Sequence, residues 1–299
     1  SGNRATTWLE PRSQKLGIAE AAAFRSAYCW DMEGPFDGAL MRAEPRAMAA
    51  WKAIGEYNGF LKKREDLYVG ATSVSPVAVL LSARPRTGRG GSFTWREEDS
   101  GLYDMLAMKS VPYDIRLLTL LTPEQLGTYQ GVVLPAATEL APAEMEMLRR
   151  YQAAGGKIYV LGATEERGGL GSAASPDAVF NSLRTSEAAR EEVVGKIRQI
   201  AGGGAWLSVE GAPYVAGNVT GLGNGKKLAV HLLNYGPAAV SNVRVKVNSG
   251  GKFEGLAAAR PRLVTPDAGT QDLGEVSRRG AELSFRLGKL DTYAVVVLE

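Results

Sequence analysis

Four short apolar runs alternate with helical stretches in the middle of this sequence, and that alternation restricts the fold more than any other feature. The runs are VAVLLS (77–82), YDIRLL (113–118), GVVLP (131–135) and KIYVLG (157–162), with helices expected at 100–109, 143–156 and 186–201. Near-continuous apolar strands separated by helices are typical of a parallel sheet covered on both faces. We therefore predict a flavodoxin-like α/β domain over residues 71–205.

The helix expected at 143–156 has the clearest pattern. Met145, Leu148 and Tyr151 are spaced to form its inward stripe. Gly155 and Gly156 follow, and either can adopt the positive φ that ends many helices.

The period changes from about Trp206 to the C-terminus. Val243, Val245 and Val247 alternate with basic residues, and Leu283, Phe285 and Leu287 alternate in the same way. Alternation with period two predicts strands with one solvated face, so we expect a small antiparallel β-sandwich over 206–299. Two further apolar strands in this region are AVHLLNY (229–235) and TYAVVVLE (292–299).

The first 70 residues are predicted to be mainly helical, at 18–28 and 45–63. In the second helix Met48, Trp51, Ile54 or Gly55, and Phe60 recur near helical spacing. Between the helices, WDMEGPFDG (30–38) is a loop by its glycines and proline.

Composition excludes several classes of function. The formal net charge is +3, and the basic residues are scattered, whereas nucleic-acid binding needs a concentrated basic surface. A single cysteine, Cys29, excludes an internal disulfide. No apolar stretch approaches the roughly 20 residues that span a bilayer. We expect a soluble protein without nucleic-acid or membrane partners, either cytoplasmic or exported with a signal peptide absent from this sequence.

The reactive residue types do not form a recognisable motif. The only histidine, His231, lies within an expected strand far along the chain from Cys29, so the sequence does not indicate a nucleophilic Cys–His pair. We expect His231 to have a structural role. The glycine-rich segments 88–91 and 167–171 fit neither standard nucleotide-binding pattern. We predict no cofactor and no metal.

Carboxylates near the N-terminus are the candidates for catalysis. Glycoside hydrolysis uses two carboxyl groups, usually beside aromatic residues that stack on sugar. The candidates for catalysis are Glu10, Asp31 and Glu33. The candidates for substrate binding are Trp8, Trp30 and Asp37. A complete (β/α)8 barrel needs about 250 residues, however, and only about 70 precede the α/β domain.

From roughly residue 18 to residue 299, the sequence resembles the region that ends and follows the catalytic barrel in glycoside hydrolases of the β-galactosidase type. The segments that carry the resemblance are REDLYVGATSVSPVAVLLS (64–82), GVVLP (131–135), AAGGKIYVLG (153–162), HLLNY (231–235) and DTYAVVVL (291–298). The resemblance implies the end of a TIM barrel over 1–70, a trimerisation domain over 71–205 and a C-terminal β-sandwich. It also implies that residues 30–37 lie near the barrel mouth and that the chain forms a homo-oligomer through the α/β domain.

Three functions follow. The first is an accessory and assembly region of a glycoside hydrolase, which acts on carbohydrate but has no complete catalytic site in this chain. The second is a free-standing carbohydrate-binding protein, which requires exposed aromatics among Trp206, Tyr214, Tyr235 and Phe253. The third is a truncated active glycosidase that uses Glu10 with Asp31 or Glu33. If residues 1–70 are the end of a barrel, their apolar residues, including Phe24, Trp51 and Phe60, are partly exposed without the missing barrel strands. Exposed apolar surface of this kind favours association or aggregation.

Overall fold

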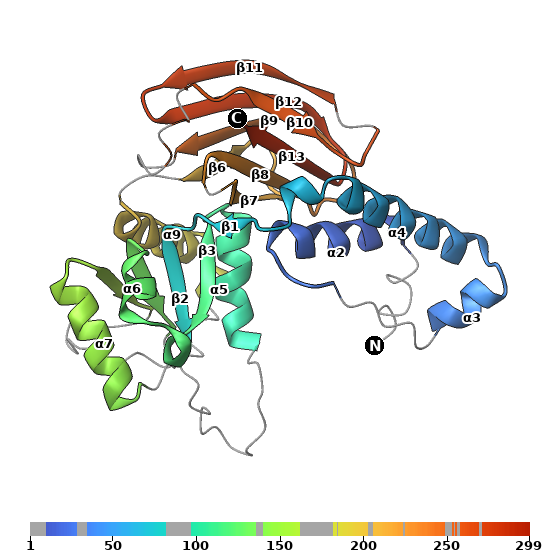
Figure 1. Ribbon diagram of the computed structural model, residues 1–299. Helices are drawn as coiled ribbons and strands as arrows, with labels where there is room; N and C mark the ends of the chain where they lie inside the picture. Colours follow the sequence, from blue (N-terminus) through green and yellow to red (C-terminus); the bar gives the residue numbers. More distant parts are fainter. Residues whose placement is uncertain are drawn as a thin grey trace. The chain divides into compact units, whose positions relative to one another are not determined.

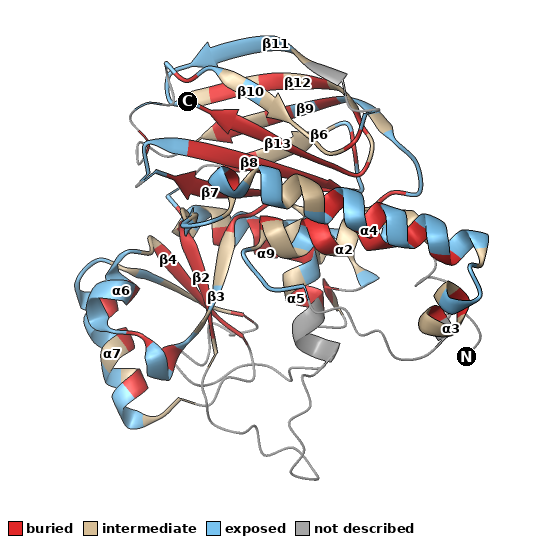
Figure 2. Ribbon diagram, turned by 45° about the vertical axis from the view of Figure 1, so that its right-hand side comes forward, coloured by how far each residue is buried: buried red, intermediate tan, exposed pale blue. Residues whose placement is uncertain are grey.

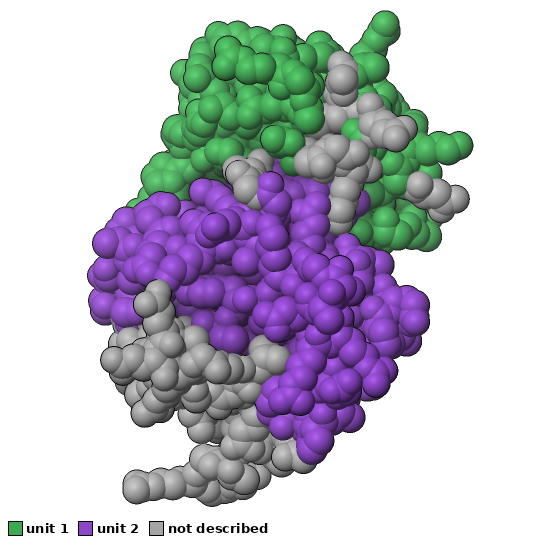
Figure 3. All heavy atoms as spheres, turned by 90° about the vertical axis from the view of Figure 1, so that its left-hand side faces the viewer, with its two compact units in different colours: residues 1–73, 207–299 green, residues 74–206 purple. Residues whose placement is uncertain are grey.

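The computed structural model (Figure 1) forms two compact units. It describes residues 10–28, 35–81, 97–135, 140–161, 182–183, 185–202, 206–223, 225–248, 253, 255, 258–268 and 271–299. Unit 1 combines 1–73 with 207–299, and unit 2 is 74–206 (Figure 3). The N-terminal helices and the C-terminal strands belong to the same compact unit.

Unit 2 contains a four-stranded parallel sheet with the order β3-β2-β4-β5. The strands are β2 (Val77–Leu81), β3 (Tyr113–Leu117), β4 (Gly131–Leu134) and β5 (Lys157–Val160). Helices α5 (Glu97–Met108) and α9 (Glu187–Ile200) contribute to one apolar core, and α6 (Pro123–Gly127) and α7 (Pro142–Ala153) to another. A short 3-10 turn, η2 (Leu118–Leu120), follows β3. The inner strands β2 and β4 are buried along almost their whole length, which explains their continuous apolar sequences.

Helix α7 ends as its sequence predicts. Gly155 has φ of +92°, its N–H donates to the carbonyl of Gln152, and the Gly156 N–H donates to the carbonyl of Tyr151. These two bonds are those of a Schellman motif. The inward face differs in part: Leu148 and Tyr151 are buried together with Glu144, whose carboxylate accepts from the N–H of Ala141.

Unit 1 contains two antiparallel sheets. The first has the order β1-β7-β8-β13-β10, from β1 (Thr72–Ser73), β7 (Val215–Leu222), β8 (Lys227–Asn234), β13 (Tyr293–Leu298) and β10 (Pro261–Val264). The second has the order β11-β12-β9-β6, from β11 (Gln271–Arg279), β12 (Glu282–Leu290), β9 (Val240–Asn248) and β6 (Leu207–Glu210). On β9 and β12 the alternating apolar residues are buried, as predicted. The expectation of a parallel sheet followed by antiparallel sheets is confirmed.

A helical layer covers the first sheet of unit 1 (Figure 2). It consists of α2 (Pro11–Ala23) and α4 (Pro45–Lys63), after which the turn η1 (Glu65–Leu67) leads to β1. Helix α3 (Pro35–Met41) precedes α4 and packs against it. Ile18 and Ala23 of α2 and Tyr57 of α4 share a core with Leu233 of β8 and Val295 of β13. Strands β8 and β13 are therefore buried on both faces, which explains why their sequences are almost continuously apolar.

Helix α2 begins and ends earlier than its sequence suggests. Pro11 occupies the first turn, where its missing N–H removes no helical bond. The helix ends at Ala23, and Arg25 then adopts a positive φ of 56°. Alanine-rich composition alone does not define where a helix begins and ends, so the limits predicted for this helix, 18–28, were wrong at both ends.

Helix α4 has the predicted limits, 45–63. Its buried face consists of small residues and one tyrosine: Ala47, Ala50, Ala53, Ile54 and Tyr57. Met48 and Trp51 lie on the other side and are each 45% exposed. The small side chains let α4 lie side by side with α2 (Figure 1), which leaves the larger apolar residues outside.

Candidate functional site

Glu10 precedes the first residue of α2 and forms an ion pair with Arg46 in the first turn of α4. The side chains of both are largely exposed, and the Glu10 side chain makes no capping bond to α2. An exposed carboxylate held by a guanidinium serves to join two helix ends. It lacks the apolar enclosure that usually suits a carboxyl group to act as a general acid.

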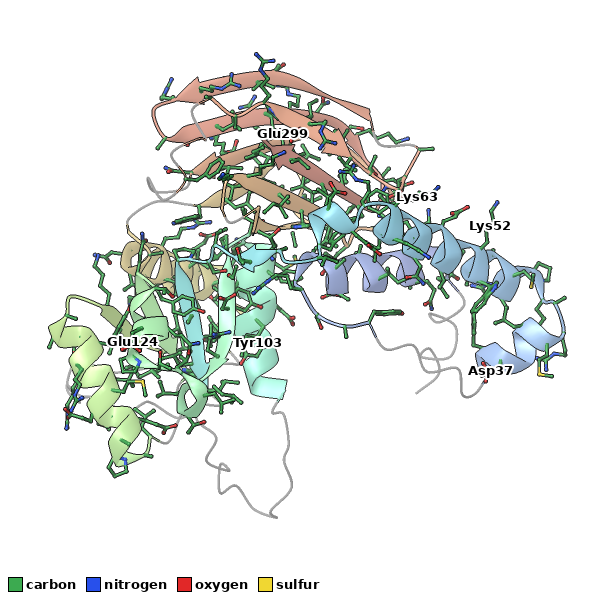
Figure 4. The ribbon with its side chains drawn as sticks, viewed as in Figure 1. Asp37, Lys52, Lys63, Tyr103, Glu124 and Glu299 are labelled. Carbon is green, nitrogen blue, oxygen red and sulfur yellow. The ribbon has the colours of Figure 1, made fainter. Side chains whose placement is uncertain are left out.

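Asp37 lies in the first turn of α3, where a carboxylate is favoured by the helix dipole (Figure 4). Its Oδ1 atom is shielded from solvent and has no hydrogen-bond partner within the described part of the chain. The other candidates, Trp8, Trp30, Asp31 and Glu33, are outside the described residues, as is Cys29. Glu10 and Asp37 thus lie at the starts of different helices, and the carboxylate of Glu10 pairs with Arg46.

One extensively bonded carboxylate among the described residues is one that the sequence did not single out. Asp267 is 4% exposed and lies between β10 and β11. Its Oδ2 atom accepts from the Tyr57 hydroxyl at 2.7 Å and from the N–H groups of Thr292 at 3.1 Å and Tyr293 at 3.0 Å. Lys15 donates to Oδ1 at 3.2 Å. Burial and the adjacent carboxylate raise the pKa of Tyr57, so its hydroxyl remains a donor.

His231 is fully buried in β8 beneath the helical layer. The Thr220 hydroxyl lies 3.0 Å from Nε2, and the Tyr293 hydroxyl lies 2.8 Å from Nδ1. Desolvation lowers the pKa of His231 to about 3, so the ring is neutral. Tyr68 extends the group, because its hydroxyl lies 3.2 Å from that of Tyr293, and burial raises the pKa of Tyr68 to about 12. The histidine therefore has the structural role expected from its sequence context.

Arg12 joins α2 to two turns between strands of unit 1. Its guanidinium donates to the Asp291 carboxylate at 2.8 Å and to the Asp291 carbonyl at 2.9 Å. It also donates to the carbonyls of Gly236 at 2.9 Å and Asn234 at 3.2 Å. A planar group with several fixed donors suits such a set of acceptors. Arg12 thus fixes the start of α2 to the first sheet.

These polar groups connect the helical layer to the first sheet of unit 1 or join neighbouring strands of that sheet. The partners of Asp267 and His231 come from the protein itself, and the two groups lie beneath the helical layer. Within the described ranges, no three His, Cys, Asp or Glu side chains converge as metal ligands. No helix among the described residues is both long enough and apolar enough to cross a membrane.

Comparison with known proteins identifies the fold. No family model matches the sequence, and no curated protein matches it. The structure is similar to α-L-fucosidase isoenzyme 2 from Paenibacillus thiaminolyticus, with a TM-score of 0.66 and 13% identity, over 97% of this chain and 57% of that one. A β-galactosidase from Bacillus circulans sp. alkalophilus matches 84% of this chain and 45% of its own, with a TM-score of 0.48 and 11% identity. The chain has a fold found in a glycoside hydrolase and spans a little over half the length of that fucosidase.

Proposed function

We propose that this chain is the accessory and assembly region of a glycoside hydrolase and acts on carbohydrate only together with a catalytic barrel. The observation that carries the proposal is the likeness to the fucosidase, which extends over 97% of this chain. The part of the fucosidase outside the match is on the order of 220 residues, from the printed coverages. That length is close to the 200 or more residues of a (β/α)8 barrel.

The state of the candidate acids supports the same proposal. Two carboxyl groups on either side of a sugar are needed for hydrolysis. Glu10 is engaged by Arg46, and Asp37 lies on a separate helix. We therefore propose that the acids that do the chemistry lie on the barrel.

Self-association through unit 2 is part of the proposal. The sheet order β3-β2-β4-β5, in which the first strand of unit 2 lies between its second and third, supports a flavodoxin-like fold. Among the described strands, the edge strand β3 pairs only with β2, and its Ile115 and Leu117 are exposed, as is Leu120 just after it. An edge strand with exposed apolar residues favours association.

The alternative of a free-standing carbohydrate-binding protein has less support. Sugar-binding platforms need exposed aromatic rings. Trp206 and Phe253 are buried, Tyr235 packs against the core beneath the helical layer, and Tyr214 is 55% exposed. A single exposed tyrosine makes a weak platform.

Activity measurements test the proposal. The purified chain is expected to hydrolyse none of a panel of 4-nitrophenyl glycosides that includes the α-L-fucoside and the β-D-galactoside. The protein isolated from its native source is expected to hydrolyse at least one of them. Turnover by the chain alone, abolished in both Glu10→Gln and Asp31→Asn variants, would establish the truncated glycosidase instead.

A further inference from the structure

Strand β3 ends the sheet of unit 2 and presents apolar side chains to solvent. Among the described strands it pairs only with β2, so its other side faces no described strand (Figure 1). Ile115 is 47% exposed and Leu117 is 42% exposed. The two side chains lie on the same face of the sheet, because residues two apart in a strand project to the same side. This edge therefore has both the backbone and the apolar surface to accept another strand.

The sequence of β3, YDIRL, is complementary to itself when it is read in the opposite direction. In antiparallel pairing of two copies centred on Ile115, this residue faces its own copy. Asp114 then faces Arg116 of the second copy, and Arg116 faces Asp114. Tyr113 and Leu117 face each other in the same way. Apolar and oppositely charged cross-strand pairs of these kinds stabilise a sheet.

Neighbouring registers lack this complementarity. A centre at Asp114 places two aspartates opposite each other, and a centre at Arg116 places two arginines opposite each other, which destabilises a sheet. A shift by one residue moves the exposed Ile115 of one copy to the opposite face of the joined sheet. Charged residues commonly protect an edge strand from other strands. Charges of one sign would do so in every register, whereas the opposite signs here permit the register centred on Ile115.

The carboxylate of Asp114 is already held in position by unit 2. The hydroxyl of Tyr129 donates to its Oδ2 atom at 2.8 Å. A carboxylate accepts several hydrogen bonds, so this bond leaves acceptor capacity for a guanidinium. A side chain that is fixed before association loses less conformational entropy when it binds. Asp114 is therefore a prepared partner for Arg116 of a second copy.

We infer that β3 pairs antiparallel with β3 of a second copy of this chain, about a two-fold axis at Ile115, and joins the two sheets into one. This inference rests on the self-association proposed above and specifies its contact. A two-fold contact is complete in a pair and predicts a dimer, whereas the family resemblance implies a trimer. An unrelated strand would need no self-complementary charges, so a second copy is the favoured occupant. The strand has only five residues, and we expect a weak dimer.

Disulfide cross-linking tests the position of the two-fold axis. In a Cys29→Ser background, Ile115→Cys places the two new thiols opposite each other, with Cβ atoms about 5 Å apart. Leu117→Cys is the matched control: its exposure is similar, but its two copies are offset by four residues along the strand, or roughly 13 Å. Under mild oxidation, we expect the Ile115→Cys dimer to form at least 10-fold faster. Equal rates would overturn the inference.

A charge exchange tests the pairing of Asp114 with Arg116. Arg116→Asp gives β3 two acids, and Asp114→Arg gives it two bases. We expect each variant alone to be monomeric at concentrations where the unmodified chain is dimeric, and an equimolar mixture to form heterodimers in sedimentation velocity. Tyr129→Phe is the control, because it removes the bond to Asp114 and keeps both charges, and it is expected to remain dimeric. A mixture that stays monomeric while both variants show folded circular dichroism spectra would contradict the inference.

The oligomeric state separates the failure of this inference from that of the proposed function. A dimer with the preferred cross-link at Ile115 supports the inference. A trimer, or a dimer without that preference, overturns the inference and leaves self-association through unit 2 intact. A chain that is monomeric at every accessible concentration overturns both. The glycoside assays test the remaining part of the proposed function independently of these results.

Discussion

The hydroxyl of Tyr57 donates a 2.7 Å hydrogen bond to the carboxylate of Asp267, although 210 residues separate them in the chain. The same carboxylate oxygen accepts two N–H groups at the start of β13. One buried acid thus connects the helical layer to the sheet beneath it. Its removal leaves a hydroxyl, two N–H groups and the Lys15 ammonium without their acceptor.

Asp267→Ala is expected to destabilise unit 1 by about 3 to 5 kcal/mol, because the groups that bonded to the carboxylate stay buried without an acceptor. Tyr57→Phe removes only one of the bonds and is expected to cost about 1 to 2 kcal/mol. Native-state hydrogen exchange of β13 amides measures both effects, with β4 amides of unit 2 as the internal control. Equal exchange in the two variants would show that Asp267 acts only through Tyr57.

Because His231 is buried, we expect the free energy of unfolding to depend on pH. Its pKa is about 3 in the folded state and about 6.5 when exposed, so the unfolded chain binds the proton more readily. The contribution is complete above pH 6.5 and is lost as the pH falls towards 3. Between pH 7.5 and pH 5.0, the wild type is expected to lose about 2 kcal/mol more than a His231→Gln variant. Urea unfolding at the two pH values measures this difference, and parallel losses would contradict it.

Arg12 and Arg46 offer a comparison between a multiply bonded arginine and an exposed one. Arg12→Lys keeps the charge but loses the planar donors and is expected to destabilise unit 1 by about 2 kcal/mol. Arg46→Lys and Glu10→Gln change an exposed ion pair and are expected to stay within about 0.5 kcal/mol. Urea midpoints of the three variants measure the contrast. A large effect at Glu10 would indicate a role beyond the surface ion pair.

Two glycines of unit 2 are expected to respond to alanine in opposite directions. A Cβ at Gly156 would lie 2.3 Å from the Tyr151 ring, so Gly156→Ala is expected to destabilise by about 2 kcal/mol. Gly195→Ala enters open space within α9 and is expected to stabilise by about 0.5 to 1 kcal/mol. Thermal unfolding of the two variants tests the signs. A stable Gly156→Ala protein would mean that Tyr151 moves aside readily.

The strands were predictable because their burial is local information. Val77–Leu81 and Gly131–Leu134 are covered on both faces, and a short apolar run records that directly. The alternation on β9 and β12 likewise records one buried face. The Schellman end of α7 was predictable because only glycine adopts its backbone conformation without strain.

The attachment of the helices to the sheets was not predictable, because its contacts join distant parts of the chain. Arg12 bonds to Asp291 across 279 residues, and no local pattern records such a pair. The buried face of α4 was equally hidden, since alanine gives little hydropathic signal and Met48 and Trp51 give a strong one on the opposite side. Asp267, in the sequence TPDAG, has the composition of an ordinary turn. The acids near the N-terminus were predicted as catalytic candidates by residue type alone. The structure shows that Glu10 forms an ion pair with Arg46, 36 residues away.

Unit 1 is made from two stretches of chain with all of unit 2 between them, and this imposes an order on its synthesis. A ribosome completes α2 and α4 long before it makes β8 and β13, on which they bury Ile18 and Tyr57. Unit 2 is continuous and can fold as soon as it emerges. The apolar faces of the first helices therefore stay uncovered by their own sheet for the seconds that this sheet takes to be translated.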